Sequence, residues 1–436
     1  MRVQFVAVLL PLVLGPTLAS AQAPPPAPEA PPPPAAPPPP APAPEAKVEP
    51  KSEAKPAEGK LSIHGYIQAQ YERHGDCVGS VAEDPTAGCD LVDSKGKSLN
   101  QNQFRLRRGR LKVIYAATEW LETVLQIDGN SDGGVELRDA EVHAIEPFSG
   151  HRMRAVVGQT KVPFGFEVVQ SSQFREWMER AQIIRKLFPT ERDRGVKLGG
   201  TLDLGVVKPF VWLGAFNGNM IGDKVFPNGD PNDNKAFVAR AGAGAKVASL
   251  GVSYWYGKNY LPNIAATPAS TSWLDQNGNS MLDAGEVKNN AATAAVASAS
   301  VVQWRFGVDA QAELAVPSVG KLAVRGEYIE ARDGARAPTT LEPVGVRSRG
   351  WYAGFVQRYA EHGGLGLRVD QLTPDIDKKD SSITTLSPIA FMQLHKQLKV
   401  TVQYDHVMDH LAPATAPATP TDLSNDVFTV RMQGDY

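Results

Sequence analysis

A short basic stretch contains the residues of this chain best suited to bind anions. Its four arginines are Arg105, Arg107, Arg108 and Arg110. Guanidinium groups stay charged at physiological pH and donate charge-assisted hydrogen bonds to phosphate and carboxylate oxygens. Arginine and lysine are also the side chains that line anion-passing pores. The stretch is therefore a candidate anion-guiding surface.

The residues around these arginines predict a strand with a bulge. Phe104 and Leu106 are apolar at even positions, whereas Leu111 and Val113 are apolar at odd positions. Because side chains alternate between the faces of a strand, an extra residue near Arg108–Gly109 must shift the register. An arginine in contact with hydrocarbon costs about 2–4 kcal/mol at the middle of a bilayer. We therefore expect the arginines to face inward or to lie near an interface.

A long insertion carries a second group of basic residues. The strand before it ends close to Lys161, a further candidate, because Pro163 cannot donate to a strand ladder. Trp177 and Ala181 then have helical spacing, and Pro189 ends that helix. The remaining basic candidates are Arg175, Arg180, Arg185, Arg192 and Arg194. Because long loops in compact domains usually have a function, we expect this one to fold inward and narrow a pore. The alternative is a loop on the outer rim with its charges in solvent.

The segment 275–286 has the spacing of an EF-hand calcium loop. Its candidate ligands are the side chains of Asp275, Asn277, Asn279, Asp283 and Glu286 and the carbonyl of Met281. Ser280 stands where the sharp turn of that loop usually requires glycine. Asn- and Gly-rich turns imitate this pattern, so a calcium site in an extracellular loop and a metal-free turn both remain open.

Few residues indicate other chemistry. Cys77 and Cys89 are the only cysteines and lie in a polar stretch, which favours a disulfide that closes a loop over a metal or catalytic role. No HExxH, Walker or Gly-x-Ser-x-Gly motif occurs. His406 and His410 lie beside a polar, Pro-rich loop, and we interpret them as solvated. The sequence predicts no enzyme, and no cofactor other than calcium.

Short alternating segments position these residues. Apolar and polar side chains alternate over 61–71, 121–127, 321–328 and 398–405, and turn-forming residues separate such segments. Tilted strands of about ten residues match the thickness of a bilayer. We therefore predict an all-β fold, a transmembrane antiparallel β-barrel of about 16 strands, with about 14 or 18 as alternatives. A soluble β-sandwich can show the same alternation.

The two ends of the chain favour the membrane barrel. Residues 1–21 have the basic start, apolar stretch and Ala19-Ser20-Ala21 cleavage site of an export signal. Residues 22–58 are rich in Pro, Ala, Glu and Lys, which predicts a disordered periplasmic spacer. The domain 59–436 ends on Tyr436 after an alternating strand, which resembles the terminal signal of outer-membrane barrels.

Overall charge does not select a partner. The chain has 45 basic and 47 acidic residues, and the expected barrel segment is similarly balanced. This balance argues neither for nucleic-acid binding nor for a uniformly cationic surface. Any preference for anions must therefore come from where the basic residues lie.

Four motifs together resemble the phosphate- and pyrophosphate-selective porin family of Gram-negative outer membranes. They are Phe104–Arg108, Gly158–Gly165, Glu191–Gly195 and Gly214–Gly218. The resemblance spans roughly residues 60–436. It implies a trimeric, 16-stranded outer-membrane barrel in which inward loops and basic residues guide anions through a constriction. It makes the four arginines of the basic stretch and Lys161 candidates for that constriction.

Three functions follow in order of preference. The first is a water-filled porin for passive diffusion of small anions such as phosphate or polyphosphate. The second is a general porin, or one selective for sugars or cations. The third is an outer-membrane enzyme or adhesin.

Overall fold

The computed structural model describes most of the expected barrel domain. The described residues are 59–75, 102–131, 134–147, 152–221, 230, 232–273, 281, 287–359, 362–409, 422 and 425–436. The expected signal segment (1–21) and spacer (22–58) lie outside these residues. So do both cysteines and every candidate calcium ligand except Met281. Those predictions remain predictions.

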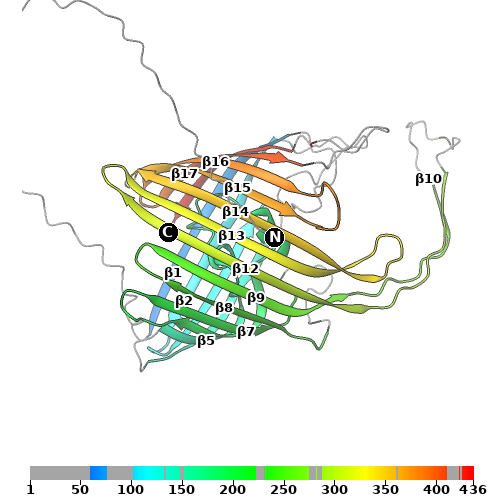
Figure 1. Cartoon of the computed structure of the whole chain (residues 1–436), viewed down its shortest axis with the longest axis horizontal. Coiled ribbons are helices and arrows are strands. Elements are labelled where there is room, and N and C mark those ends of the chain that lie inside the picture. Colours follow the sequence, from blue (N-terminus) through cyan, green and yellow to red (C-terminus); the bar gives the residue numbers. More distant parts are fainter. Residues whose placement is uncertain are drawn as a thin grey trace, which may run out of the picture. The chain divides into compact units, whose positions relative to one another are not determined.

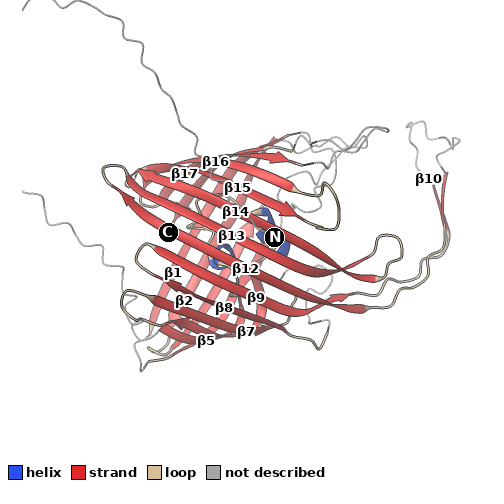
Figure 2. Cartoon of the chain, viewed as in Figure 1, coloured by secondary structure: helices blue, strands red, loops and turns tan. Residues whose placement is uncertain are grey.

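Sixteen antiparallel strands close into a barrel, as predicted (Figures 1 and 2). They are β1 (Lys60–His74), β2 (Asn102–Ala116), β3 (Leu121–Asn130), β4 (Gly134–Ile145), β5 (Arg152–Lys161), β6 (Arg192–Thr201), β7 (Lys208–Phe216), β8 (Ala236–Gly244), β9 (Ala248–Leu261), β12 (Ala299–Val316), β13 (Gly320–Arg336), β14 (Pro343–Tyr359), β15 (Gly363–Thr373), β16 (Ile383–His395), β17 (Leu398–Met408) and β18 (Val427–Asp435). Each strand pairs with its sequence neighbours, β9 pairs with β12, and β1 closes the barrel against β18.

A two-stranded sheet and two short helices lie between the barrel strands. Strands β10 (Ser270–Trp273) and β11 (Val287–Asn290) form a separate two-stranded sheet. Helices α1 (Phe166–Val169) and α2 (Gln182–Leu187) lie in the connection between β5 and β6. Within the described residues, no helix is long and apolar enough to cross a bilayer.

The connections are short at one end of the barrel and long at the other. Residues 396–397 join β16 to β17, whereas residues 162–191 join β5 to β6 at the opposite end. Outer-membrane barrels have short turns in the periplasm and long loops outside the cell. We therefore assign the short-turn end, where β18 also ends, to the periplasm.

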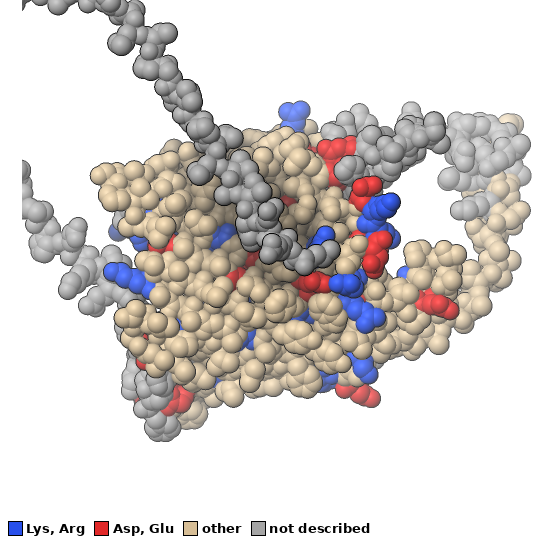
Figure 3. Space-filling model, viewed as in Figure 1, with Lys and Arg blue, Asp and Glu red and all other residues tan. Residues whose placement is uncertain are grey.

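Side chains alternate between an apolar outer wall and a polar lumen. On β1, Ile63 and Ile67 are 56% and 50% exposed, whereas Gln68 and Gln70 are buried. On the face drawn in Figure 3 the outer wall is mainly uncharged, and charged side chains gather towards the end where β10 lies. This inside-out distribution confirms the predicted transmembrane barrel.

The predicted bulge in the basic stretch is present, one residue earlier than expected. Gln68 pairs with Arg108 and Ala69 with Leu106, so Arg107 is the extra residue. As a result Arg107 and Arg108 both point into the lumen, while Leu106 stays on the apolar outer wall. This one extra residue explains why the apolar side chains of β2 change from even to odd positions.

Strand β4 contains a second bulge, which the sequence analysis did not predict. Leu137 pairs with Ile127 and Asp139 with Gln126, which leaves Arg138 as the extra residue. Arg138 and Asp139 are both buried on the lumen side. The signal in the sequence is again a change of apolar parity within one strand.

Residues 162–191 fold into the barrel, which confirms the inward interpretation, and are called the inward loop below. The rings of Phe164 and Phe188 pack at 4.8 Å between centroids, and Phe188 packs edge-on to Trp255 of β9 at 6.1 Å. All three are nearly or fully buried. The hydrophobic core thus lies inside the barrel, between the inward loop and one wall.

The predicted helix in the inward loop forms only in its second half. The Nε1–H of Trp177 donates to the carbonyl of Ser387 on β16 at 3.1 Å, whereas Glu176 and Glu179 contact other walls. A helix would place side chains three or four positions apart on one face. The segment before α2 is therefore irregular, because its side chains reach different strands.

The pairing of β9 with β12 continues beyond the barrel as an arm (Figure 1). Ile264 bridges to Val296 and Thr267 to Thr293, after which β10 pairs with β11. The segment with calcium-loop spacing connects β10 to β11. If calcium binds there, it binds on the long-loop side of the membrane.

Candidate functional site

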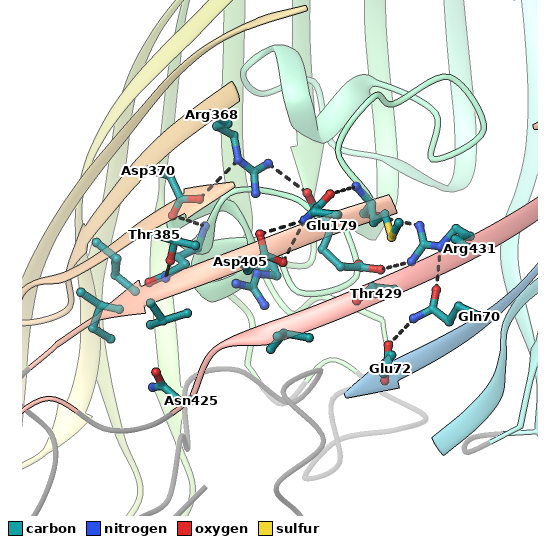
Figure 4. Close-up of a pocket in the computed structure, with 18 of the residues that line it drawn as sticks. Gln70, Glu72, Glu179, Arg368, Asp370, Thr385, Asp405, Asn425, Thr429 and Arg431 are labelled. Carbon is teal, nitrogen blue, oxygen red and sulfur yellow. Dashed lines mark hydrogen bonds and ion pairs between the residues drawn. The ribbon is translucent and has the colours of Figure 1, made fainter. Parts of the chain in front are cut away.

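The basic stretch of β2 converges on one carboxylate of the inward loop. Both Arg107 and Arg108 donate to Glu179, with the shortest contacts at 3.0 Å, and Arg431 of β18 donates to it at 2.9 Å. Figure 4 shows Arg431 between Glu179 and Gln70. Burial alone would raise the pKa of Glu179, but the surrounding guanidinium groups hold it well below its usual range.

The other arginines of the basic stretch also have carboxylate partners. Arg105 lies 3.2 Å from Glu72 of β1, and Arg110 lies 2.8 Å from Asp128 of β3. All four arginines of this stretch, which were predicted to guide anions, therefore have carboxylate partners, and Arg107 and Arg108 share one of them. These partners were missed because they come from other strands and from the inward loop.

A second loop carboxylate binds arginines of the opposite wall. Glu176 accepts hydrogen bonds from Arg325 of β13 and Arg358 of β14. Glu176 is itself buried. Together with Glu179 it fixes the inward loop to both sides of the barrel.

The return of the inward loop to β6 contains a third network. Glu191 accepts hydrogen bonds from Arg180 and from Arg192, the latter at 2.7 Å, and lies 3.6 Å from Arg138. Arg192 also donates to Asp139 of β4. Burial would raise the pKa of Glu191, but Arg180 and Arg192 hold it well below its usual range.

The remaining predicted arginines are dispersed. Arg175 is buried, and its three guanidinium nitrogens have no hydrogen-bond partner in the described part of the chain. Arg185 lines the small cavity of Figure 4, towards the long-loop end. The Nε–H of Arg194 donates to the amide oxygen of Gln159 at 3.3 Å. These residues do not form one site.

Three lysines facing the lumen form no ion pair with any described carboxylate: Lys112 of β2, Lys161 of β5 and Lys197 of β6. Lys161 Nζ donates to the carbonyl oxygens of Val169 and Gln170 at 3.2 and 2.7 Å. Lys197 Nζ donates to a hydroxyl and to a backbone carbonyl at 2.8 and 2.9 Å. Carbonyl and hydroxyl groups position an ammonium group without cancelling its charge. Of these three lysines, sequence reasoning had selected only Lys161.

These lysines line a cavity of about 740 Å³ beside the inward loop, towards the periplasmic end. We call it the basic vestibule. Its basic side chains are Arg110, Lys112, Lys161, Arg192, Lys197 and Arg240. Its acidic side chains are Asp139 and Glu141. Arg110, Arg192 and Arg240 have carboxylate partners, so the excess positive charge of this cavity comes from its three lysines.

The cavity at the other end is much smaller and has a different charge. It has a volume of about 80 Å³ and lies between the inward loop and strands β15 to β18 (Figure 4). Its charged lining consists of Arg107, Arg185, Arg368, Arg431, Glu72, Glu179, Asp370, Asp405 and Asp409. Acidic groups balance the arginines here, so this cavity carries no excess positive charge.

Aromatic side chains also line the basic vestibule, and sequence reasoning missed them. Phe210 and Trp212 lie on the lumen face of β7, and Phe166 and Phe174 come from the inward loop. The sequence of β7 could have indicated them, because this strand is apolar at both odd and even positions. In a barrel whose lumen is otherwise polar, such a strand marks a specialised wall.

A closed barrel with an apolar outer wall, a polar lumen and an inward loop defines a porin of the bacterial outer membrane. A family model described as phosphate-selective porin O and P matches residues 87–338. The chain belongs to this family, as the motifs in its sequence indicated. The family and the architecture are those of a diffusion channel rather than of an enzyme.

Solved structures share this fold at low sequence identity. The outer membrane channel DcaP of Acinetobacter baumannii is 11% identical, with a TM-score of 0.54 over 87% of this chain and 98% of that one. An anion-selective porin from Comamonas acidovorans is 9% identical, with a TM-score of 0.53 over 87% and 100%. OmpT of Vibrio cholerae, in a trimer form, has the same identity, TM-score and coverage. No curated protein matches the sequence.

Proposed function

We propose that this porin passes small anions in preference to cations, with phosphate and polyphosphate among them. The observation that carries the proposal is the basic vestibule, where no described carboxylate forms an ion pair with Lys112, Lys161 or Lys197. The family description and the anion-selective porin of the same fold support the same sign of selectivity.

The physical basis is a local excess of positive charge beside water. Ammonium groups on a low-dielectric wall raise the local concentration of anions and replace part of their hydration shell. Lys161 is held by carbonyl oxygens of the inward loop, so its charge lies where that loop narrows the lumen. By contrast, carboxylates neutralise most arginines of the basic stretch. We therefore assign anion preference to the lysines and loop anchoring to the arginines.

Planar-bilayer recording of the purified protein tests this assignment. A reversal potential in a KCl gradient should show preference for chloride, and added phosphate should reduce the chloride current. Each of Lys112→Gln, Lys161→Gln and Lys197→Gln should lower the anion-to-cation permeability ratio roughly twofold. Arg347→Gln is the matched control, because Arg347 is an exposed cation on the outward-facing side of β14. Preference for cations in the unaltered protein would refute the proposal.

The pairing of most lumen arginines supports a general porin as the second candidate. Glu176 and Glu179 together form ion pairs with guanidinium groups on four strands. A general porin would show a permeability ratio near unity that none of the three lysine substitutions changes.

We also propose that the barrel assembles as a homotrimer. The trimer form of OmpT, which has the same fold, supports this state. Sedimentation or light scattering of the detergent-solubilised protein, corrected for bound detergent, should give three times the mass of one chain. A monomeric mass would rule the trimer out.

A further inference from the structure

We infer that the basic vestibule is a binding site for aromatic carboxylates, a class of organic anion distinct from bare phosphate. The inference rests on the proposed anion preference, because such a ligand must enter an anion-passing lumen. It is carried by aromatic rings and unpaired lysines that line one cavity.

The clearest sign is an aromatic ring exposed inside the pore. Phe174 of the inward loop is 68% exposed and lines the basic vestibule. Lumen-facing side chains of such barrels are typically polar, and an exposed phenyl ring is unfavourable in water. A ligand with a flat apolar body would cover this surface, whereas inorganic phosphate would not.

Strand β7, which pairs with β6, supplies two further rings. On β7, Trp212 lies 5.6 Å from Lys197 Nζ, and Phe210 lies 5.2 Å from the guanidinium carbon of Arg240, both measured to ring centroids. These distances are in the range of cation–π contacts. The vestibule therefore brings cations and aromatic faces close enough for one small molecule to meet both.

Glycines on the neighbouring strands make room for these rings. A Cβ at Gly199 of β6 would lie 2.9 Å from Trp212 Cδ2, and a Cβ at Gly242 of β8 would overlap the ring of Phe210. Side chains at these two positions would displace the rings from where they lie. The aromatic surface is thus built by three adjacent strands.

Size and charge select the ligand class. The vestibule, at about 740 Å³, is in the range of small-molecule sites, about 300–1,000 Å³. Lys161 and Lys197 can bind a carboxylate while the rings of Trp212 and Phe174 pack against an aromatic body. Neutral sugars also stack on aromatic rings, but they would leave the ammonium charges unused.

The test is competition for the chloride current in planar bilayers, with benzoate, acetate, inorganic phosphate and benzyl alcohol as probes. We expect benzoate to halve the current at a concentration about tenfold below that of acetate. Phe174→Ser should bring the two concentrations together. Phe104→Ser is the matched control, because Phe104 is 86% exposed on the outer wall.

The outcomes separate this inference from the proposed function. If the pore prefers chloride but benzoate blocks no better than acetate, the aromatic site is refuted and the anion pore stands. If benzyl alcohol blocks as well as benzoate, the site does not recognise charge and the inference also fails. If Phe174→Ser leaves benzoate block intact, the assigned ring is wrong. A cation-preferring pore would instead refute the proposed function.

Discussion

Glu179 is the residue that links the structure of the inward loop to the charge of the lumen. It lies against Arg107 and Arg108 of β2 and Arg431 of β18. One carboxylate thus holds the loop in place and cancels part of the positive field of three cations. The arginines of the basic stretch are in this sense loop anchors, and their charge is largely hidden from passing ions.

Removing this carboxylate should increase anion preference. In Glu179→Gln the three guanidinium groups lose their counter-ion, so the anion-to-cation permeability ratio should rise at least roughly twofold. Reversal potentials in a KCl gradient measure this permeability ratio. Glu330→Gln is the matched control, because Glu330 pairs with Arg347 on the outward-facing side of the barrel. A larger single-channel conductance with an unchanged ratio would show that Glu179 anchors the loop without setting selectivity.

The depressed pKa of Glu191 predicts how its contribution depends on pH. Its folded pKa lies below the ordinary carboxyl value, so the stabilisation is fully present above about pH 4.3 and is lost as pH falls through the lower folded value. The difference in thermal midpoint between the unaltered protein and Glu191→Gln should be constant from about pH 8 to pH 5 and shrink below about pH 4. Circular dichroism in detergent gives both midpoints. A difference that disappears between about pH 7 and pH 5 would contradict the assignment.

At the scale of elements, the entry turn of the inward loop depends on a glycine. Gly165 has φ 56°, and its N–H donates to Ser253 Oγ at 3.0 Å. A Cβ at this position would overlap the carboxylate of Glu327 on β13. The loop enters the lumen at this point because only glycine combines the left-handed backbone with such close approach.

Gly165→Ala should therefore destabilise the inward loop. We expect a loss of about 2–4 kcal/mol, from the left-handed conformation and from overlap with Glu327 together. Unfolding in detergent and single-channel conductance, which should rise if the loop detaches, measure the effect. Gly205→Ala is the matched control, because Gly205 also has positive φ but open space around it. Equal losses in both variants would assign the effect to backbone strain alone.

The arm formed by β10 and β11 carries the remaining element-level prediction. We propose that segment 275–286 binds calcium at extracellular, millimolar concentrations. Calcium should then raise the thermal midpoint of the unaltered protein but not of Glu286→Gln. Magnesium at the same concentration is the control ion. Equal calcium shifts in both proteins would show that this segment binds no calcium.

At the scale of the whole molecule, the two ends of the lumen differ in charge. The basic vestibule lies towards the periplasmic end, whereas acidic groups balance the arginines of the other cavity. Anions that cross thus meet the excess of positive charge on the periplasmic side of the inward loop. The near-neutral composition of the chain conceals this separation.

Because ammonium groups facing water act through a screened field, selectivity should depend on salt. The Debye length falls from about 10 Å at 0.1 M to about 3 Å at 1 M ionic strength. The permeability ratio should therefore decrease markedly when mean KCl rises over that range at a fixed gradient. A ratio that is constant over this range would indicate selection by contact with anions at a tight site.

The residue pattern by itself determined the strands and their faces. Side chains alternate with a period of two over segments such as 61–71 and 398–405, and this local property places one face in lipid and the other in water. The bulge in β2 was predicted from a break in this alternation. The inward loop was predicted from the length of its segment and from Pro163, which marks the end of the preceding strand. All of these are local properties of the chain.

Tertiary structure alone decided which cations have a carboxylate partner. Arg431 and Glu179 are 252 residues apart in sequence but 2.9 Å apart in space, and no local pattern predicts such a pair. Closing the barrel and folding the loop inward brought acidic groups to the arginines and left Lys112 and Lys197 without carboxylate partners in the described lumen. A Coulomb interaction depends on distance in space, so its strength is fixed only when the chain has folded.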